Sequence, residues 1–362
     1  MIKSTLLIFI FILFLSGIVA GQEVPRNWRE EKTRKVKMPR YYKASLPKKS
    51  ISVADIRIEQ AVPDSTQLGF LQKGLNNQKM KAVPASNLTI FLQDYITKQY
   101  KNDFKSKGVK LLLVVKNLRI NESTFFSAER AFARLHADAY ISQDDSLYSF
   151  VANMDTVQVY RGMDVTAFHG ENIAAALHKL IVQSLNKAEN GLSALPGGVV
   201  LDSVLSNAKK IKLHPIQKTG RYREGVYLNF HEFLSNDPSL KLYDVEPESI
   251  GTARIFSFNP DSTKKEIIPW GLCKKGELYK YHENRLVPIE KYRNEFIISD
   301  YIDKANRRNR GIAAAGFLGG ITGAAIAYSS AERLYSVTSI PYITKRQPEA
   351  SVIDMKTGEF TF

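Results

Sequence analysis

Alternating apolar and polar positions predict several strands in the first half of the chain. Residues 51–59 alternate as expected for a strand buried on one face, and residues 110–119 contain a more continuous apolar run. Residues 149–160 predict a further strand, which a hairpin joins to the one before it. That preceding strand follows a strict period of two, with one face formed by Ala133, Leu135, Ala137, Ala139 and Ile141.

Two amphipathic segments predict helices that cover this sheet. Ser86 or Asn87 can cap the first helix, whose apolar positions fall on one stripe: Leu88, Ile90, Phe91, Tyr95 and Ile96. The second helix follows His169 to Asn172 and ends near Gly191. The order of elements predicts an α+β domain over residues 50–194, with an antiparallel sheet and helices on one face.

Short apolar runs separated by turn residues predict a β-meander domain over residues 223–362. Residues 195–222, which begin near the pair Gly197-Gly198, are expected to form a linker. Lys274 to Gly276 and Glu283-Asn284 have the composition of tight turns. The strands are expected at residues 253–258, 270–273, 277–282 and 285–289.

A glycine-rich apolar segment, residues 311–328, interrupts this β-rich domain. It contains no charged residue and follows three arginines, Arg307, Arg308 and Arg310. As a helix it would place small residues on one side, Gly316, Gly319, Gly320 and Gly323, and bulky ones on another, Phe317, Leu318 and Ile321. The glycines would cost about 3 to 4 kcal/mol in water relative to alanine, so the helix needs close packing.

Three interpretations of residues 311–328 remain open. The favoured one is a membrane-associated helix of the glycine-zipper type, because small residues allow helices to approach closely within lipid. The second is a helix buried against the β-rich domain or in a homo-oligomer, and the third is a flexible loop. The spacing of the glycines does not fit a dinucleotide-binding motif, and no strand precedes them.

The N-terminus has the pattern of a secretory signal peptide over residues 1–20. Lys3 precedes an uninterrupted apolar run, Leu6 to Leu15, and small or β-branched residues follow up to Ala20. The alternative is a retained membrane anchor. Because no cysteine lies near the expected cleavage point, the sequence does not predict a lipoprotein.

The chain carries 51 Lys and Arg against 36 Asp and Glu, a net charge of +15. Residues 21–49 hold about half of this excess and lack a sustained apolar period, so they are expected to form a flexible basic arm. Arg34, Lys35 and Lys37 of this arm, together with the three arginines before the glycine-rich segment, are candidates for contact with an anionic surface. A mere spacer is the alternative. In an exported protein we expect no nucleic-acid partner.

Local motifs for catalysis are missing from the sequence. One cysteine and six histidines exclude a disulfide scaffold and a zinc ribbon, and His231-Glu232 lacks the second histidine of a zincin motif. His169 is interpreted as a helix-entry residue, and His136 with Asp138 as an exposed pair. Cys273 is expected to be a small buried side chain. We therefore predict no catalytic residue, metal or cofactor.

The order of elements in the first domain resembles that of small envelope lipoproteins that assist ABC transporters or lipopolysaccharide assembly. Three C-terminal segments, GVYLNFHEFLSNDP, PWGLCKKGELYKY and SVIDMKTGEFTF, resemble a module of uncharacterised secreted proteins of Gram-negative bacteria. The first resemblance implies an accessory role in the envelope, and the second implies the compartment. Neither assigns a site residue.

These observations predict a non-enzymatic exported protein of the cell envelope, in the periplasm or at the outer membrane. Residues 311–328 would associate it with a membrane, and the basic arm would add attraction to anionic headgroups. The alternative is a soluble periplasmic module that binds a glycan, a lipid or a protein. A third hypothesis, an enzyme, requires a cleft that brings His136, His169 or Cys273 together with a carboxylate.

Overall fold

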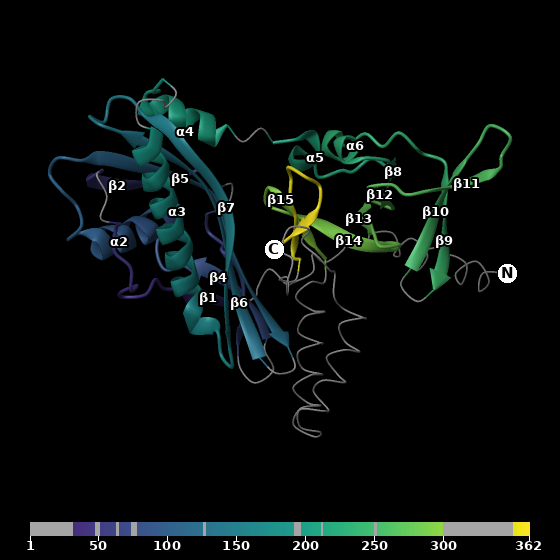
Figure 1. The fold of residues 1–362 in the computed structure, drawn as a ribbon. Helices are drawn as coiled ribbons and strands as arrows, with labels where there is room; N and C mark the ends of the chain where they lie inside the picture. Colours follow the sequence, from purple (N-terminus) through teal and green to yellow (C-terminus); the bar gives the residue numbers. More distant parts are fainter. Residues whose placement is uncertain are drawn as a thin grey trace, which may run out of the picture. The chain divides into compact units, whose positions relative to one another are not determined.

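Three β-sheets, accompanied by a few helices, make up the described part of the chain (Figure 1). The fold therefore belongs to the mixed α and β class, with strands predominating. The computed structural model describes residues 32–47, 51–62, 65–73, 78–125, 128–191, 197–210, 213–249, 252–299 and 350–362. The expected signal peptide, residues 307–310 and the glycine-rich segment with its seven named residues lie outside these ranges.

The first sheet has the strand order β1-β4-β3-β5-β6-β7, with β2 paired to β5. Strand β5 lies at its centre, antiparallel to β6 and parallel to β2. Strand β1 is also parallel to its neighbour β4, so the sheet is mixed rather than antiparallel as predicted. The strands are β1 (Thr33–Val36), β2 (Val53–Gln60), β3 (Gly69–Lys73), β4 (Gln78–Pro84), β5 (Val109–Phe125), β6 (Ala128–Ser142) and β7 (Ser149–Gly162).

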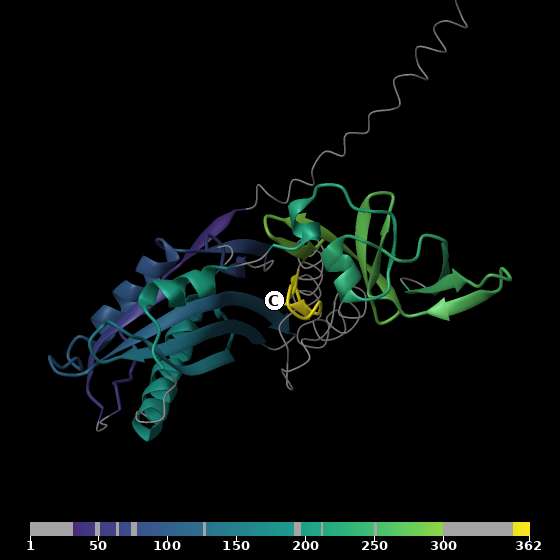
Figure 2. The same cartoon turned by 90° about the horizontal axis from the view of Figure 1, so that it is seen from above.

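Helices α2 (Leu88–Tyr100) and α3 (His169–Gly191) pack against one face of this sheet (Figures 1 and 2). Asn87 caps α2, because its side-chain oxygen accepts the N–H of Thr89 at 3.0 Å. Ile90 is 53% exposed and Leu92 is buried in its place, so the predicted apolar stripe was wrong at Ile90. The predicted inward face of β6 is confirmed: Ala133, Leu135, Ala137, Ala139 and Ile141 all belong to this core.

A smaller helix, α4 (Leu201–Lys209), packs on the opposite face of the sheet, which departs from the prediction of helices on one face only. Val204 of α4 packs in a second apolar cluster, which also contains Leu112 and Val114 of β5. These two side chains alternate with the residues that β5 directs toward α2 and α3. Continuous apolar character in this strand therefore reflects burial on both faces.

Residues 37–46, here called the strap, lie across helices α2 and α3. Met38, Tyr42 and Leu46 pack on the core, so one residue in four is directed inward. The side chain of Gln99 accepts the N–H of Tyr42 at 3.0 Å and donates to the carbonyl of Tyr42 at 2.7 Å and of Ala44 at 2.6 Å. With β1 paired to β4, these contacts correct the prediction of a flexible arm for residues 33–46.

The correction has a simple physical reason. The basic residues that suggested a solvated arm are exposed, whereas the few apolar residues between them are the ones that dock. The first turn of α3 also accommodates the strap: a Cβ at Gly170 would lie 2.1 Å from the carbonyl oxygen of Lys37. Only glycine allows this approach without a shift of the backbone.

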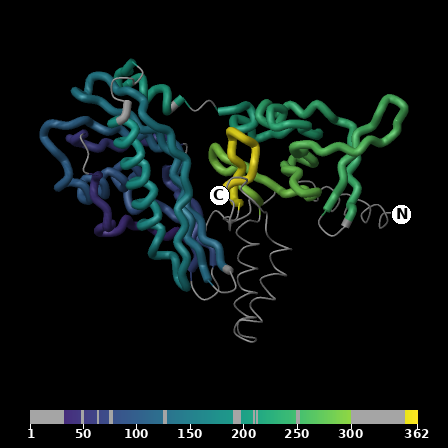
Figure 3. The backbone as a smooth tube through the Cα atoms, in the orientation of Figure 1, coloured from purple at the N-terminus to yellow at the C-terminus, as the bar shows by residue number. Residues whose placement is uncertain are grey.

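The second half of the described chain is a β-meander with a small extra sheet (Figure 3). The longer sheet has the order β17-β16-β15-β14-β13-β12-β8, and the shorter one β11-β10-β9. The predicted turns at Lys275-Gly276 and Glu283-Asn284 are present, with positive φ at all four residues. The strands are β8 (Gly225–Tyr227), β9 (Tyr243–Ser249), β10 (Thr252–Phe258), β11 (Lys264–Ile267), β12 (Gly271–Lys274), β13 (Glu277–His282), β14 (Arg285–Tyr292), β15 (Glu295–Ile298), β16 (Val352–Ile353) and β17 (Phe360–Thr361).

Short helices, α5 (Pro215–Lys218) and α6 (Phe230–Ser235), precede or interrupt this meander. Asn229 caps α6 by accepting the N–H of Glu232 at 3.1 Å, and Asn236 ends it in the left-handed conformation. Across the described ranges, no helix combines the length and the apolar character needed to cross a bilayer.

Candidate functional site

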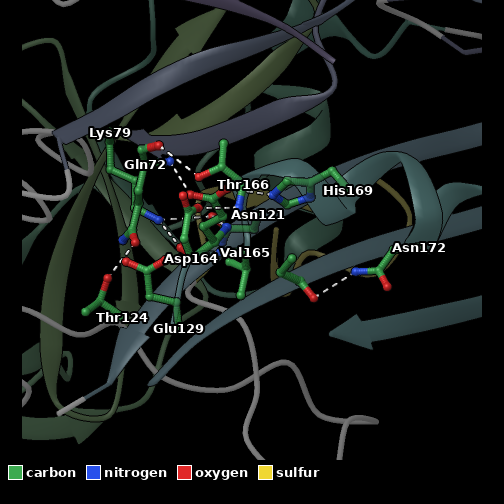
Figure 4. A network of polar contacts seen from close by, with 12 residues as sticks. Gln72, Lys79, Asn121, Thr124, Glu129, Asp164, Val165, Thr166, His169 and Asn172 are labelled. Carbon is green, nitrogen blue, oxygen red and sulfur yellow. Dashed lines mark hydrogen bonds and ion pairs between the residues drawn. The ribbon is translucent and has the colours of Figure 1, made fainter. Parts of the chain in front are cut away.

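A buried polar network lies where strands β3, β4 and β5 meet the start of helix α3 (Figure 4). Its centre is Glu122 of β5, which has no exposed surface. Gln72 of β3 and Lys79 of β4 approach Glu122 from neighbouring strands, and His169 approaches from the first residue of α3. The β3–β4 hairpin, strand β5 and helix α3, which are far apart in sequence, thus direct polar side chains to one point.

The carboxylate of Glu122 is shared between two partners. One oxygen, Oε1, lies 2.8 Å from Nε2 of His169, and the other accepts the backbone N–H of Gln72. The ammonium of Lys79 donates to the backbone carbonyl of Glu122, and its Nζ lies 3.3 Å from Oδ1 of Asn121. The carboxylate, the imidazole and the ammonium therefore form one connected group.

Gly69 permits this arrangement by letting β3 pass close to β5. Its φ is +129°, and a Cβ there would lie 2.0 Å from the carbonyl oxygen of Ile120. The N–H of Ile120 donates to the carbonyl of Leu68 at 2.6 Å across the same crossing. This close approach brings Gln72 next to the polar end of β5, where Thr124 donates to the Gln72 side chain.

Three buried polar atoms of the network have no hydrogen-bond partner among the described residues: Nε2 of Gln72, Oγ of Ser123 and Nδ1 of His169. Each is an exception to the usual pairing of buried polar groups. The unmatched Nδ1 leaves one polar edge of the buried imidazole without a hydrogen bond. Because an ionised carboxylate only accepts hydrogen bonds, Nε2 of His169 is the donor to Glu122.

A second carboxyl, that of Glu129, lies at the edge of the network. Burial, with a smaller contribution from the charge of Glu122, raises the pKa of Glu129 from 4.5 to about 7. The N–H of Val165, which donates to Glu129 at 3.4 Å, and the nearby Lys79 act in the opposite direction. Glu129 therefore holds its proton near neutral pH more readily than an exposed carboxyl.

The chemistry open to this group is limited by its burial. Lys79, Glu122 and His169 are each 2% exposed or less, so a dissolved substrate does not reach their polar tips. No three histidine, cysteine or carboxylate side chains in the described ranges are grouped as a metal site would require. The arrangement can hold charge and protons inside the domain, and it fixes four elements relative to one another.

Several residues considered from the sequence are placed elsewhere. His136 and Asp138 do lie on one face of β6, but they are bridged rather than exposed: Asn153 Nδ2 lies 3.0 Å from His136 and 2.6 Å from Asp138. Asp138 also pairs with Lys116 and is 7% exposed, so the prediction of an exposed pair was wrong. Burial lowers the pKa of His136.

Cys273 is fully buried, as predicted. Burial raises the pKa of its thiol to about 11, and the charge of Glu224 adds to the effect. Of the three residues that the enzyme hypothesis named, His169 does contact a carboxylate, that of Glu122, but both side chains are buried. Arg34, Lys35 and Lys37 are exposed, on strand β1 and directly after it, in keeping with their role as surface candidates.

Sequence reasoning did not find Gln72, Lys79 or Glu122. Residues 69–84 were not predicted as strands, so β3, which carries Gln72 and pairs with β5, and β4, which carries Lys79 and pairs with β3, were missed. The run Asn121-Glu122-Ser123-Thr124 looks like the polar end of a strand that enters solvent. The one available signal was His169, a histidine at a helix start, which does begin α3 as interpreted.

Comparison with known proteins adds little to this picture. No protein-family model and no curated protein matches the chain. Among solved structures, it is similar to protein XCC0632 from Xanthomonas campestris, of the family DUF330, with a TM-score of 0.31 and 14% sequence identity. That similarity covers 44% of this chain and 97% of the other. No residue role is carried over from it.

Proposed function

We propose that this protein is an exported, non-enzymatic accessory protein of the cell envelope. The observation that carries the non-enzymatic part is the burial of the Glu122 network. An enzyme must present its acid, base or nucleophile to the substrate, whereas Glu122 and His169 present their polar atoms to each other inside the domain. Cys273 is likewise buried and has a raised pKa. These groups stabilise a scaffold.

Support for the envelope comes from the sequence. Residues 1–20 have the order of a signal peptide, and residues 311–328 have the composition of a helix that packs in or against lipid. The protein would act through its surfaces, by holding a position at a membrane and contacting other envelope components. The charge excess of +15 suits anionic headgroups in that setting.

Cell fractionation tests this proposal. The full chain, tagged at its C-terminus and expressed in a Gram-negative host, should be recovered in the membrane pellet and resist a carbonate wash. Its N-terminus should begin near Gly21 or Gln22, which reports cleavage of the leader. An uncleaved chain recovered from the cytosol would overturn the proposal.

A set of variants distinguishes an effect of the glycine-rich segment from a nonspecific effect of replacing glycine by leucine. Replacing Gly316, Gly319, Gly320 and Gly323 by Leu should disturb assembly through this helix, because bulky residues prevent close helix packing, and chemical crosslinking in the membrane fraction measures the loss. The variant should stay in the carbonate-resistant pellet, because Leu enters lipid more readily than Gly. The matched control replaces Gly197 and Gly220 by Leu, since nothing lies within 4 Å of a Cβ at either position. Recovery of a cleaved chain wholly in the soluble fraction would favour a periplasmic binding module instead.

A further inference from the structure

Five exposed lysines surround the point where the strap meets the end of helix α2. Lys43 belongs to the strap, Lys98 and Lys101 to the end of α2, and Lys105 and Lys107 to the loop that follows. We call these five residues the lysine cluster. Sequence analysis did not group them, because Lys43 is separated from the others by more than fifty positions.

Hydrogen bonds to the backbone hold the strap against the end of α2 and hold the following loop against β2. Gln99 binds the main chain on both sides of Lys43, through the carbonyls of Tyr42 and Ala44. Further along, Asp103 accepts the N–H of Leu46 at 3.1 Å. The N–H of Lys105 donates to the carbonyl of Val53 at 2.8 Å, which holds the loop against the start of β2. The lysine cluster is therefore presented on a fixed backbone.

The charges of the lysine cluster are not balanced within the described part of the chain. None of its five side chains makes an ion pair or a hydrogen bond there. Two carboxylates lie close in sequence, Asp103, which accepts the N–H of Leu46, and Asp94, one helical turn before Lys98, so five lysines against two carboxylates leave an excess of three positive charges. Elsewhere the same domain does pair its lysines, as in the 2.9 Å contact of Lys110 with Asp145.

The position of the lysines at a helix end accounts for only part of the cluster. Lys98 and Lys101 lie at the C-terminal end of α2, where positive charge interacts favourably with the helix dipole. That effect falls off within the last turn, so it explains neither Lys43 nor the two lysines of the loop. These three residues gain nothing from α2 and add to an exposed positive surface.

We propose that the lysine cluster is the surface through which the protein contacts an anionic lipid bilayer. A bilayer supplies mobile negative headgroups, which can neutralise lysines that form no ion pair with carboxylates of the protein. Tyr41, which is 70% exposed and two residues before Lys43, adds an aromatic side chain of the kind that settles at a membrane interface. A protein partner would instead call for an apolar patch at the centre of the surface.

This inference rests on the proposed function, but it can be wrong while the proposed function is right. Fractionation reports where the chain goes in the cell, whereas binding to vesicles reports which surface meets lipid. The purified mature chain, with residues 311–328 in place, is mixed with vesicles of phosphatidylglycerol and phosphatidylcholine or of phosphatidylcholine alone. The bound fraction is measured by sedimentation at several lipid concentrations.

The test variant replaces Lys101, Lys105 and Lys107 by Gln, and the control variant replaces Lys265, Lys274 and Lys275 by Gln. All six residues are exposed, and both variants change the net charge by the same amount. The test variant should bind the anionic vesicles on the order of 100-fold more weakly than the parent, and the control variant should bind like the parent. Circular dichroism confirms that both variants fold.

Salt provides a second measurement on the unchanged protein. Raising NaCl from 0.1 M to 1 M shortens the screening length from about 10 Å to about 3 Å, so binding through the lysine cluster should fall strongly. The inference is overturned if the parent does not prefer anionic vesicles, or if the two triple variants lose binding equally. It is also overturned if soluble polyglutamate binds the parent as tightly as the vesicles do, because the partner would then be an acidic protein.

Discussion

Glu122 and His169 lie 2.8 Å apart, between Oε1 and Nε2, and neither side chain is more than 1% exposed. The contact joins the central strand β5 to the first residue of helix α3. The other oxygen of the same carboxylate accepts the N–H of Gln72 on β3. One side chain therefore fixes a helix and two strands, and its removal would leave several buried polar groups without a partner.

Glu122→Gln should lower the free energy of unfolding by about 2 to 4 kcal/mol. The amide can replace one hydrogen bond but not the charge that faces His169 and Lys79, and a broken buried pair is costly. Urea unfolding followed by circular dichroism measures the difference. The control is Glu248→Gln on an exposed stretch of β9, which should change the stability by less than about 0.5 kcal/mol. Equal effects of the two substitutions would argue against a structural role for Glu122.

Glu129 should make the protein less stable as the pH rises from about 5 to 8. In the unfolded chain the carboxyl loses its proton near its ordinary pKa of 4.5, whereas in the folded chain the pKa is about 7. Between these values the folded state binds more protons, so raising the pH favours unfolding. Solvent partly screens the group, which limits the loss to about 1 to 2 kcal/mol.

Replacing Glu129 by Gln isolates this contribution. The variant mimics the protonated carboxyl at every pH, so the stability of the parent minus that of the variant should decline from pH 5 to 8. This difference removes the opposite contributions of His136 and His178, whose pKa values burial lowers. Urea unfolding at pH 5, 6, 7 and 8 gives both curves, and Glu248→Gln should follow the parent. A difference between parent and variant that does not decline across this window would show that Glu129 is ionised in the folded state.

The strands that could be predicted are those with a regular pattern. Strand β6 alternates so strictly that its inward face was predicted residue by residue. Strands β3 and β4 were missed because Lys79 and Gln72 are buried, and their polar side chains break the alternation on which the prediction depends. A local pattern cannot indicate that the ammonium of Lys79 will be bonded by oxygen atoms of β5, 42 positions away in the sequence.

The strap is a second case in which a local sequence pattern did not predict tertiary contacts. Its basic residues are exposed, and exposure was predicted for Lys37, as it was for Arg34 and Lys35 of the preceding strand β1. Its docking depends on Met38, Tyr42 and Leu46 and on backbone bonds to Gln99, and these contacts join segments 57 positions apart. Composition describes how a segment meets water, but it does not report the tertiary contacts that order it.

Cys273 should be unreactive in the folded protein. The thiol is buried and its pKa is about 11, so the thiolate that attacks a disulfide reagent is scarce at pH 8. Ellman's reagent should detect no thiol in native buffer and one thiol per chain in 6 M guanidinium chloride. Rapid labelling of the folded protein would reopen the hypothesis of a reactive cysteine.

Gly170→Ala should destabilise the protein and loosen the strap, although alanine favours a helix by about 1 kcal/mol. The new Cβ would lie 2.1 Å from the carbonyl oxygen of Lys37, so the strap must move away from α3. We expect a net loss of about 1 to 3 kcal/mol and faster trypsin cleavage after Lys37, Arg40 or Lys43. Gly197→Ala, where a Cβ meets nothing within 4 Å, is the matched control and should leave both quantities unchanged. If Gly170→Ala instead behaves like this control, the strap does not depend on its contact with the start of α3.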